Sequence, residues 1–169
     1  DKSMDVLRQK MEQIVAGKKA VVGVSIMGSD GGDTLSFYGD RHFPMQSVFK
    51  FHIALAVLAE VDKGRLSLDQ QIEIKKEELL PEDVWSPLRD EHPDGGFFTI
   101  AQLIQYTVSH SDNTACDILI DLIGTPKTVE EYIRGKGIQD IQITFNEMDM
   151  QAEWDNMFQN WTTPKAATE

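Results

Sequence analysis

Hydrophobic side chains recur along the chain with two periods, one helical and one extended. A helical spacing over residues 3–16 predicts a first helix that ends at Gly17. Residues 20–27 and 34–39 are instead rich in β-branched and aromatic side chains on either side of a Gly-rich turn, which predicts a β-hairpin. The chain is therefore expected to open as a helix followed by two antiparallel strands.

An uninterrupted apolar run at residues 53–59 predicts a helix that is buried on all sides, beginning near Ser47 and ending at about Asp62. Residues 66–74 then alternate between apolar and polar side chains, which predicts a short extended segment. Residues 75–96 are polar and interrupted by Pro and Gly, so we expect an ordered surface excursion with little regular structure.

Helical spacing returns in three segments, residues 99–108, 115–123 and 126–135. Thr99 is the expected N-cap of the first of them, and the short turns between them predict a compact helical layer. Beyond Gly137 the chain becomes irregular, and so long an irregular segment is uncommon in a compact domain unless it serves function. Thr163-Pro164 then resembles the start of another helix.

Composition narrows the possible partners. A chain of 169 residues with 41% hydrophobic content can bury a real core, and its length suggests one domain or little more. The formal charge of −12, from 28 acidic and 16 basic residues, argues against nucleic acid or an anionic membrane as main partner. The single cysteine, Cys116, excludes an internal disulfide and a cysteine-rich metal site. No apolar run is long enough to span a membrane, and residues 1–5 do not resemble a signal peptide.

A serine and a lysine stand at the start of the apolar helix. Ser47 and Lys50 are three residues apart, so a helix places hydroxyl and amine on one face of its first turn. A serine hydroxyl needs a neighbouring base to attack an amide carbonyl, and Lys50 can be that base only in its neutral form, which burial or cationic surroundings favour. The pattern indicates a serine nucleophile; the plainer alternative is a chance match in which Ser47 is an N-cap.

Two later features bear on this choice. The tripeptide Ser111-Asp112-Asn113 falls between two predicted helices, where loop side chains can face a cleft, although a cluster of N-cap residues is its plainer explanation. Trp85, in the polar excursion, either packs on its own domain or lines a ligand site.

The order Ser-x-x-Lys, then Ser-Asp-Asn, is that of class A β-lactamases and penicillin-binding proteins. On these motifs the chain resembles a class A serine β-lactamase from near Asp1 to Glu169.

This resemblance implies an α+β fold of the serine β-lactamase and penicillin-binding type, in which a helical domain packs on an antiparallel sheet. Only the first helix and the hairpin of the sheet domain are expected in this chain, as residues 1–42. Residues 43–169 are expected to form the helical domain, with the active-site helix and a glutamate-bearing loop, truncated at its C-terminal end. The family's Lys-Thr-Gly strand, which binds the substrate carboxylate, has no match here. We therefore expect the chain to be incomplete and inactive alone.

The resemblance also implies roles for the residues of the two motifs. Ser47 is the acylated nucleophile and Lys50 a base that shuttles protons. Ser111 donates to the lactam nitrogen, and Asn113 anchors the substrate and Lys50. Trp85 forms an aromatic wall of the cleft.

A glutamate in the irregular segment completes the implied machinery. Glu147 matches the residue that positions the deacylating water, although without the two motifs it would be one of many solvated surface acids. Gln151 stands where the family commonly has an asparagine that helps to hold this water, so the longer amide puts the water geometry in doubt. Whether Lys50 or Glu147 takes the serine proton during acylation stays open.

The implied function is hydrolysis of β-lactam antibiotics through an acyl-serine intermediate, with a small-molecule β-lactam as substrate and with no metal or cofactor. Penicillin-binding D-alanyl-D-alanine carboxypeptidases and transpeptidases share the same motifs but lack a base comparable to Glu147. A third alternative is a non-enzymatic fragment, or half of a complementing pair whose partner is the C-terminal segment of the same protein. The family implies a mature protein in the periplasm or outside the cell.

Overall fold

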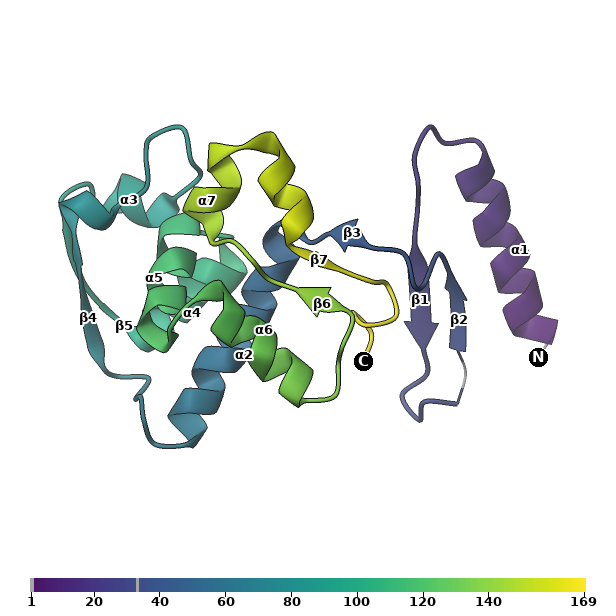
Figure 1. Ribbon diagram of the computed structural model, residues 1–169, viewed down its shortest axis with the longest axis horizontal. Helices are drawn as coiled ribbons and strands as arrows, with labels where there is room; N and C mark the ends of the chain where they lie inside the picture. Colours follow the sequence, from purple (N-terminus) through teal and green to yellow (C-terminus); the bar gives the residue numbers. More distant parts are fainter. Residues whose placement is uncertain (1, 33) are drawn as a thin grey trace. The chain divides into compact units, whose positions relative to one another are not determined.

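The computed structural model describes residues 2–32 and 34–169, and the chain divides into two compact units (Figure 1). The second unit comprises residues 44–161, and the first contains the segments on both sides of it, residues 1–43 and 162–169. The last residues belong with the first unit because they bond to it: the Lys165 N–H donates to the Gly39 carbonyl at 3.1 Å, and the Ser25 and Thr168 hydroxyls lie 3.2 Å apart. The expected domain of residues 43–169 differs from the second unit by residue 43 and residues 162–169.

The first unit contains the predicted helix and hairpin. Its elements are α1 (Lys2–Ala16), β1 (Val24–Met27) and β2 (Thr34–Phe37). The two strands pair antiparallel, with Val24 opposite Phe37, and both are shorter than expected. Tyr38 adopts a left-handed conformation with a φ of 49°, which is incompatible with a strand and limits β2 to Phe37. The Arg8 guanidinium donates to the Ser36 carbonyl at 2.9 Å and so joins α1 to the hairpin.

The second unit is mainly helical. Its α-helices are α2 (Phe49–Asp62), α3 (Pro87–Glu91), α4 (Ile100–Ser109), α5 (Asn113–Ile123), α6 (Pro126–Gly135) and α7 (Glu147–Ala152). Three short 3₁₀ helices are η1 (Gln46–Val48), η2 (Lys76–Glu78) and η3 (Trp154–Gln159). Strands β4 (Gln71–Lys75), β5 (Gly95–Thr99) and β6 (Ile141–Gln142) lie within it, whereas β3 (Phe43–Pro44) and β7 (Trp161–Thr162) each have one residue in either unit. Helices and antiparallel strands together make the expected α+β fold.

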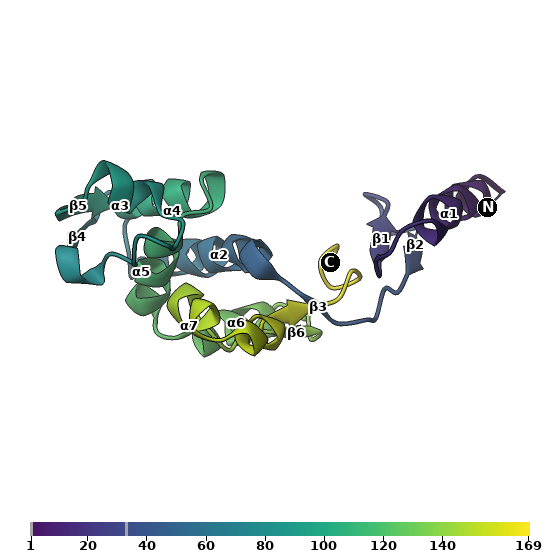
Figure 2. The ribbon, with the colours of Figure 1, turned by 90° about the horizontal axis from the view of Figure 1, so that it is seen from above.

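Helix α2 is the centre of this unit. It packs against α4, α5 and α6, and Figure 2 shows α3 and α4 on one side of α2 and α5, with α6 and α7 on the other. Phe49, Ile53 and Val57 are fully buried in the core between these helices. The prediction of burial on all sides is wrong, because Leu58 is 37% exposed and one side of α2 reaches the surface.

The polar segment after α2 contains more regular structure than the sequence indicated. Residues 75–96 were expected to have little, but they include η2, α3 and the start of β5, which pairs antiparallel with β4. The two glycines that suggested a loop are strand residues. Gly95 has a φ of 81°, and an added Cβ there would lie 2.1 Å from the Ile74 carbonyl oxygen, so this tight pairing requires glycine.

The later helices follow the predicted pattern closely. Thr99 caps α4 as expected, its hydroxyl accepting the Gln102 N–H at 3.1 Å. Helix α5 begins two residues before the predicted start, because Asp112 is its N-cap and accepts the Ala115 N–H at 2.8 Å. The irregular segment contains only β6, α7, η3 and β7. The predicted helix at Thr163 is a turn, although the Thr163 hydroxyl does accept the Ala166 N–H, at 3.1 Å.

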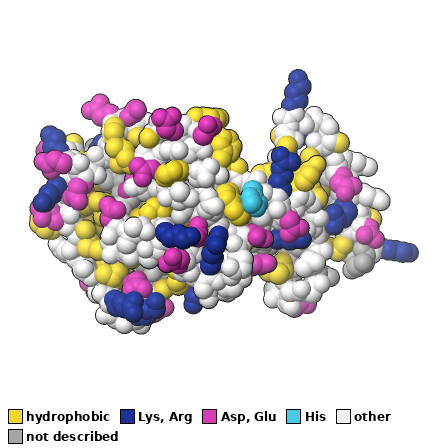
Figure 3. Space-filling model, viewed as in Figure 1, with side chains coloured by type: hydrophobic (Ala, Val, Ile, Leu, Met, Phe, Trp, Pro, Cys, Tyr) yellow, Lys and Arg dark blue, Asp and Glu magenta, His cyan; other side chains and the backbone are white. Residues whose placement is uncertain are grey.

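The acidic side chains on one face of the second unit are scattered. On the face of the second unit seen in Figure 3, Asp and Glu side chains lie among hydrophobic ones and do not form one patch. Among the described residues, no helix is both long and apolar enough to cross a membrane. The same part of the chain contains no group of three or more His, Cys, Asp or Glu side chains arranged to hold a metal ion.

Candidate active site

A buried lysine lies at the centre of a polar cluster in the second unit. Lys50, in the first turn of α2, is only 2% exposed. Its Nζ lies 3.1 Å from Ser47 Oγ, 3.1 Å from Ser111 Oγ, 2.6 Å from Asn113 Oδ1 and 3.2 Å from Glu147 Oε1. The Ser111 carbonyl oxygen is a fifth neighbour, at 3.0 Å. An ammonium has three protons to donate, so these five oxygens share them.

Ser47 is the exposed member of this cluster. It lies in η1, just before α2, where residues three apart are nearly eclipsed, so the predicted juxtaposition with Lys50 is present. Its Oγ also receives a hydrogen bond from Ser111 Oγ at 2.9 Å. The preceding residue, Gln46, has a left-handed φ of 50°. The hydroxyl therefore faces solvent while the amine behind it is buried, which is the arrangement a serine nucleophile needs.

The loop between α4 and α5 aims two side chains at Lys50. Ser111 has a left-handed φ of 52°, a conformation that costs a non-glycine residue on the order of 1–3 kcal/mol. The Tyr106 carbonyl secures the loop by accepting the N–H groups of His110 and Asp112, at 3.2 and 3.0 Å. The loop thereby presents the Ser111 hydroxyl to this amine, and Asn113, two residues later at the start of α5, presents its amide oxygen to it.

Asp112 has a structural role, and its hydrogen-bond partners among the described residues do not include Lys50. Its fully buried carboxylate accepts the N–H groups of Ala115 and Leu88, at 2.8 and 2.7 Å, and the Ser86 hydroxyl at 3.2 Å. The plainer explanation of the tripeptide, helix capping, is therefore correct for its middle residue. These bonds fasten the Ser111 loop to the segment that carries Trp85.

Trp85 lies beside this loop and is 62% exposed. Its indole N–H donates to the His110 carbonyl at 2.9 Å, and its own carbonyl accepts the Asn113 N–H at 3.3 Å. The side chain is thus held next to the cluster, as a wall of a cleft would be. Its proposed contact with substrate stays a prediction.

Glu147 is the first residue of α7 and is 4% exposed. Burial and the ion pair with Lys50 exclude the alternative that it is an ordinary surface acid. The Asn146 side chain caps α7 by accepting the Asp149 N–H at 2.9 Å. Gln151, one turn after Glu147, is exposed and makes no hydrogen bond to the described members of the cluster, so the structure does not bring it to Lys50.

Two buried residues that position the Glu147 segment were not found from the sequence. Asp117, on α5, accepts the N–H groups of Glu147 and Met148, at 2.7 and 2.9 Å. Burial raises the pKa of the Asp117 carboxyl to about 7, against the lowering effect of these two N–H groups, and the negative charges of Glu147 and Asp121 raise it further. The available signal was an acidic residue within an otherwise apolar stretch of helix.

Asn160 is the second such residue and is fully buried. Its Oδ1 accepts the N–H groups of Thr144 and Phe145, at 2.8 and 3.0 Å, and its Nδ2 donates to the Phe145 carbonyl at 2.8 Å. Its backbone carbonyl accepts the Met45 N–H at 2.8 Å. The Asn160 side chain thus joins the end of this segment to residues 144 and 145, which precede α7. Its backbone bond to Met45 lies two residues before Ser47. Nothing in the local sequence distinguishes this asparagine from its neighbours.

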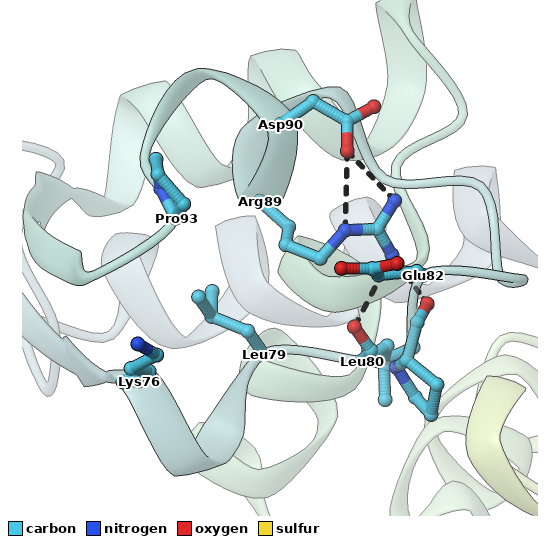
Figure 4. A pocket seen from close by; sticks show the side chains of 8 residues that line it. Lys76, Leu79, Leu80, Glu82, Arg89, Asp90 and Pro93 are labelled. Atoms are coloured by element: carbon cyan, nitrogen blue, oxygen red, sulfur yellow. Dashed lines mark hydrogen bonds and ion pairs between the residues drawn. The ribbon is translucent and has the colours of Figure 1, made fainter.

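A surface hollow of about 670 Å³ lies apart from this cluster, among η2, α3 and the segment between them (Figure 4). Arg89 lines this hollow, but its guanidinium already donates to the carbonyls of Leu80, Pro81 and Val84 and to the Asp90 carboxylate. The residues that line the hollow include no serine or histidine. The cluster at Lys50, and not this hollow, is the candidate active site.

Known proteins resemble this chain in both sequence and fold. Residues 6–169 match the sequence family described as "Beta-lactamase enzyme family". The chain is 49% identical to β-lactamase VEB-1 of Pseudomonas aeruginosa over 162 residues, which are 96% of this chain and 54% of that protein. A crystal structure of a β-lactamase from Chitinophaga pinensis DSM 2588 is 48% identical, with a TM-score of 0.91 over 94% of this chain and 58% of that one.

A representative class A β-lactamase from Bacteroides cellulosilyticus DSM 14838 is 38% identical, with a TM-score of 0.87 over 94% of this chain and 57% of that one. The chain spans about half the length of the curated relatives that it matches.

Proposed function

Since this chain belongs to the β-lactamase enzyme family and has the fold of class A β-lactamases, we propose that the whole protein hydrolyses β-lactam antibiotics through an acyl-serine intermediate. One observation carries the proposal: the buried Lys50 amine contacts the exposed Ser47 hydroxyl, the Ser111 hydroxyl and the Glu147 carboxylate at once. Nucleophile, proton carriers and deacylation base thus lie within one hydrogen-bonded cluster.

In the acylation step, Ser47 Oγ attacks the lactam carbonyl carbon and gives up its proton. Either Lys50, whose Nζ lies 3.1 Å from Ser47 Oγ, takes it directly, or Glu147, whose carboxylate lies 3.2 Å from the same Nζ, takes it through a water. The C–N bond of the ring then breaks. The leaving nitrogen receives a proton from Ser111, whose hydroxyl is replenished by Lys50 at 3.1 Å. The Ser47 backbone N–H is a suitable donor to the oxyanion.

In the deacylation step, a water attacks the Ser47 ester while Glu147 removes its proton. The C–O bond to Ser47 breaks, and the proton returns to the serine oxygen through the same cluster. A carboxylate is suited to this task because it can accept a proton, and Glu147 is held in the same cluster as Ser47 through Lys50. The mechanism uses side chains and water only, and requires no cofactor.

Glu147 favours this function over that of a penicillin-binding peptidase. A peptidase that penicillin acylates lacks a comparable deacylation base, whereas Glu147 is buried at 3.2 Å from the Lys50 amine. We therefore expect the whole protein to turn over nitrocefin repeatedly. A single stoichiometric burst would instead identify a peptidase.

The proposed location, the periplasm or the cell exterior, is tested by fractionation of expressing cells.

The role of Glu147 is tested with Glu147→Gln in the whole protein. We expect intact-mass spectrometry to show an acyl adduct on Ser47 that accumulates after β-lactam is added. Lys50 can still accept the serine proton during acylation, whereas the base for deacylation is gone. Ser47→Ala should form no adduct. Asp149→Asn removes an exposed acid from the same helix and should turn over like the wild type. Unchanged steady-state turnover by Glu147→Gln would refute the proposed role.

A further inference from the structure

A hydrogen bond to sulfur links the segment that carries Glu147 to the turn that carries Ser47. Gln46 Nε2 donates to Met157 Sδ at 3.2 Å. Gln46 comes directly before Ser47 in η1, and Met157 lies in η3, which follows α7. Gln46 has a left-handed φ of 50°, a conformation that persists only where surrounding contacts hold it. The Met157 thioether is one of these contacts.

Met157 differs in accessibility from the buried methionines near the site. Met45 and Met150 are only 2% and 7% exposed, and both belong to the hydrophobic core. Met157 is partly exposed, and Met148, the second residue of α7, is 45% exposed. An oxidant must contact the sulfur that it attacks, so a small soluble oxidant should reach Met157 and Met148 first.

The charge of this segment favours a neutral oxidant. Residues 137–164 include no lysine or arginine, and their acidic residues include Glu153 and Asp155, which are both exposed close to Met157 in the chain. A negative surface lowers the local concentration of anions but does not repel an uncharged molecule. Hydrogen peroxide is uncharged and small, which makes it the class of oxidant that this site admits.

The oxidation step transfers one oxygen atom. A lone pair of the Met157 sulfur attacks one oxygen of hydrogen peroxide, the O–O bond breaks, and an S–O bond forms. The other peroxide oxygen leaves as water with both protons, so the sulfur is oxidised to the sulfoxide and the peroxide is reduced. No other co-reactant is needed.

The sulfoxide cannot keep the present contact with Gln46. A thioether is a small, weak acceptor, whereas a sulfoxide is polar and chiral. Oxygen on the lone pair that faces Gln46 pushes the two side chains apart. Oxygen on the other lone pair withdraws electron density from the sulfur and weakens it as an acceptor. In both epimers the link between η3 and the residue before Ser47 changes.

We propose that Met157 is an oxidation site of this protein, at which hydrogen peroxide slows the turnover of β-lactams by loosening the contact between Met157 and Gln46. The effect on turnover rests on the proposed function, whereas the oxidation itself does not. Neither Ser47 nor Glu147 is altered chemically. The loss is reversible, because methionine sulfoxide reductases return the sulfoxide to the thioether.

The test treats the whole protein with hydrogen peroxide and follows nitrocefin turnover and peptide masses over time. The peptide with Met157 should gain one oxygen atom before those with Met45 and Met150. Turnover should fall in parallel by about two- to tenfold, the factor that corresponds to the loss of one hydrogen bond. Methionine sulfoxide reductase should restore it.

Two variants separate Met157 from the other exposed methionine of the segment, each compared with its own untreated rate. Met157→Leu has no sulfur to oxidise and should keep its turnover in peroxide. Met148→Leu is the matched control and should lose turnover as the wild type does. The proposal is overturned if Met157→Leu remains as sensitive as the wild type, or if Met157 carries the oxygen while turnover is unchanged.

A further measurement needs no variant and no activity. In the wild-type protein, the side-chain amide resonances of Gln46 should shift as Met157 is oxidised, and an unchanged Gln46 amide would overturn the proposed contact. Failure of the proposed function is distinguishable, because the untreated whole protein would then not turn over nitrocefin, while the masses and the Gln46 resonances would still report on Met157.

Discussion

The Lys50 amine and the Glu147 carboxylate lie 3.2 Å apart, with side chains only 3% and 5% exposed. They come from α2 and α7, almost a hundred residues apart in the sequence, and each would be an unpaired buried charge without the other. The pair therefore couples the Glu147 segment to the helix that carries Ser47, in stability as well as in chemistry.

Lys50→Met should destabilise the protein by roughly 3–5 kcal/mol, because it leaves the Glu147 charge buried without a partner. The double variant Lys50→Met/Glu147→Gln should recover part of that loss. The control is Lys63→Met, which breaks the more exposed pair of Lys63 and Glu60 (3.2 Å) and should cost far less, because water screens this pair. Urea denaturation followed by circular dichroism measures all three. Equal losses for Lys50→Met and Lys63→Met would contradict the assignment of a buried pair.

Asn160→Ala should loosen the Glu147 segment. It removes the acceptor for two N–H groups and the donor to the Phe145 carbonyl, at about 1–3 kcal/mol for each buried group left unpaired. Hydrogen exchange should speed up at Thr144 and Phe145, with the amides of α4 unaffected. Asn160→Asp keeps the acceptor and should protect both amides better than alanine does. If the two variants exchange alike, the side-chain oxygen is not what holds this segment.

Gly95→Ala should destabilise the β4–β5 pair by about 2–5 kcal/mol, from a left-handed φ and a clash with the Ile74 carbonyl. Gly64 is the matched control, since it has a φ of 71° but no neighbour within 4 Å of an added Cβ. Gly64→Ala should therefore cost only the conformational part, about 1–2 kcal/mol. Thermal unfolding of both variants gives the comparison, and similar losses would show that the close approach of Ile74 is unimportant.

Asp117 should make the folded protein less stable as the pH rises. Its pKa is about 7 in the folded state against an ordinary value of 3.8, so between these values the folded state binds more protons than the unfolded state. The stability that this group contributes is complete below about pH 4 and is lost as the pH rises through 7. At about 1.4 kcal/mol per pKa unit, the loss is about 4 kcal/mol.

Asp117→Asn removes this dependence. The difference in unfolding free energy between variant and wild type should shift in favour of the variant by a few kcal/mol from pH 4 to pH 8. Urea denaturation at each pH measures it, and the other carboxyl groups cancel in the difference. A difference that stays constant with pH would show that Asp117 does not titrate in this range. The same charge that positions Glu147 thus costs stability.

Local features of the sequence were predictable where neighbouring residues decide the conformation. The helical spacing, Thr99 and Pro126 place α4 and α6 nearly at their observed bounds, because capping and periodicity are short-range effects. The strand β5 was missed for the opposite reason. Its glycines indicate a loop when taken alone, and only the approach of Ile74 explains them.

The sequence by itself determined the helical periods, the caps and the two short motifs that bring Ser47 next to Lys50 and Ser111 next to Asn113, since each lies within a turn or two of chain. Only the tertiary structure decided that these motifs meet at one buried amine, that Glu147 is buried and paired, and that Asp117 and Asn160 hold its backbone. These contacts join residues that are 15 to 97 positions apart in the printed sequence. Their geometry depends on how the helices pack around α2, which no local pattern specifies.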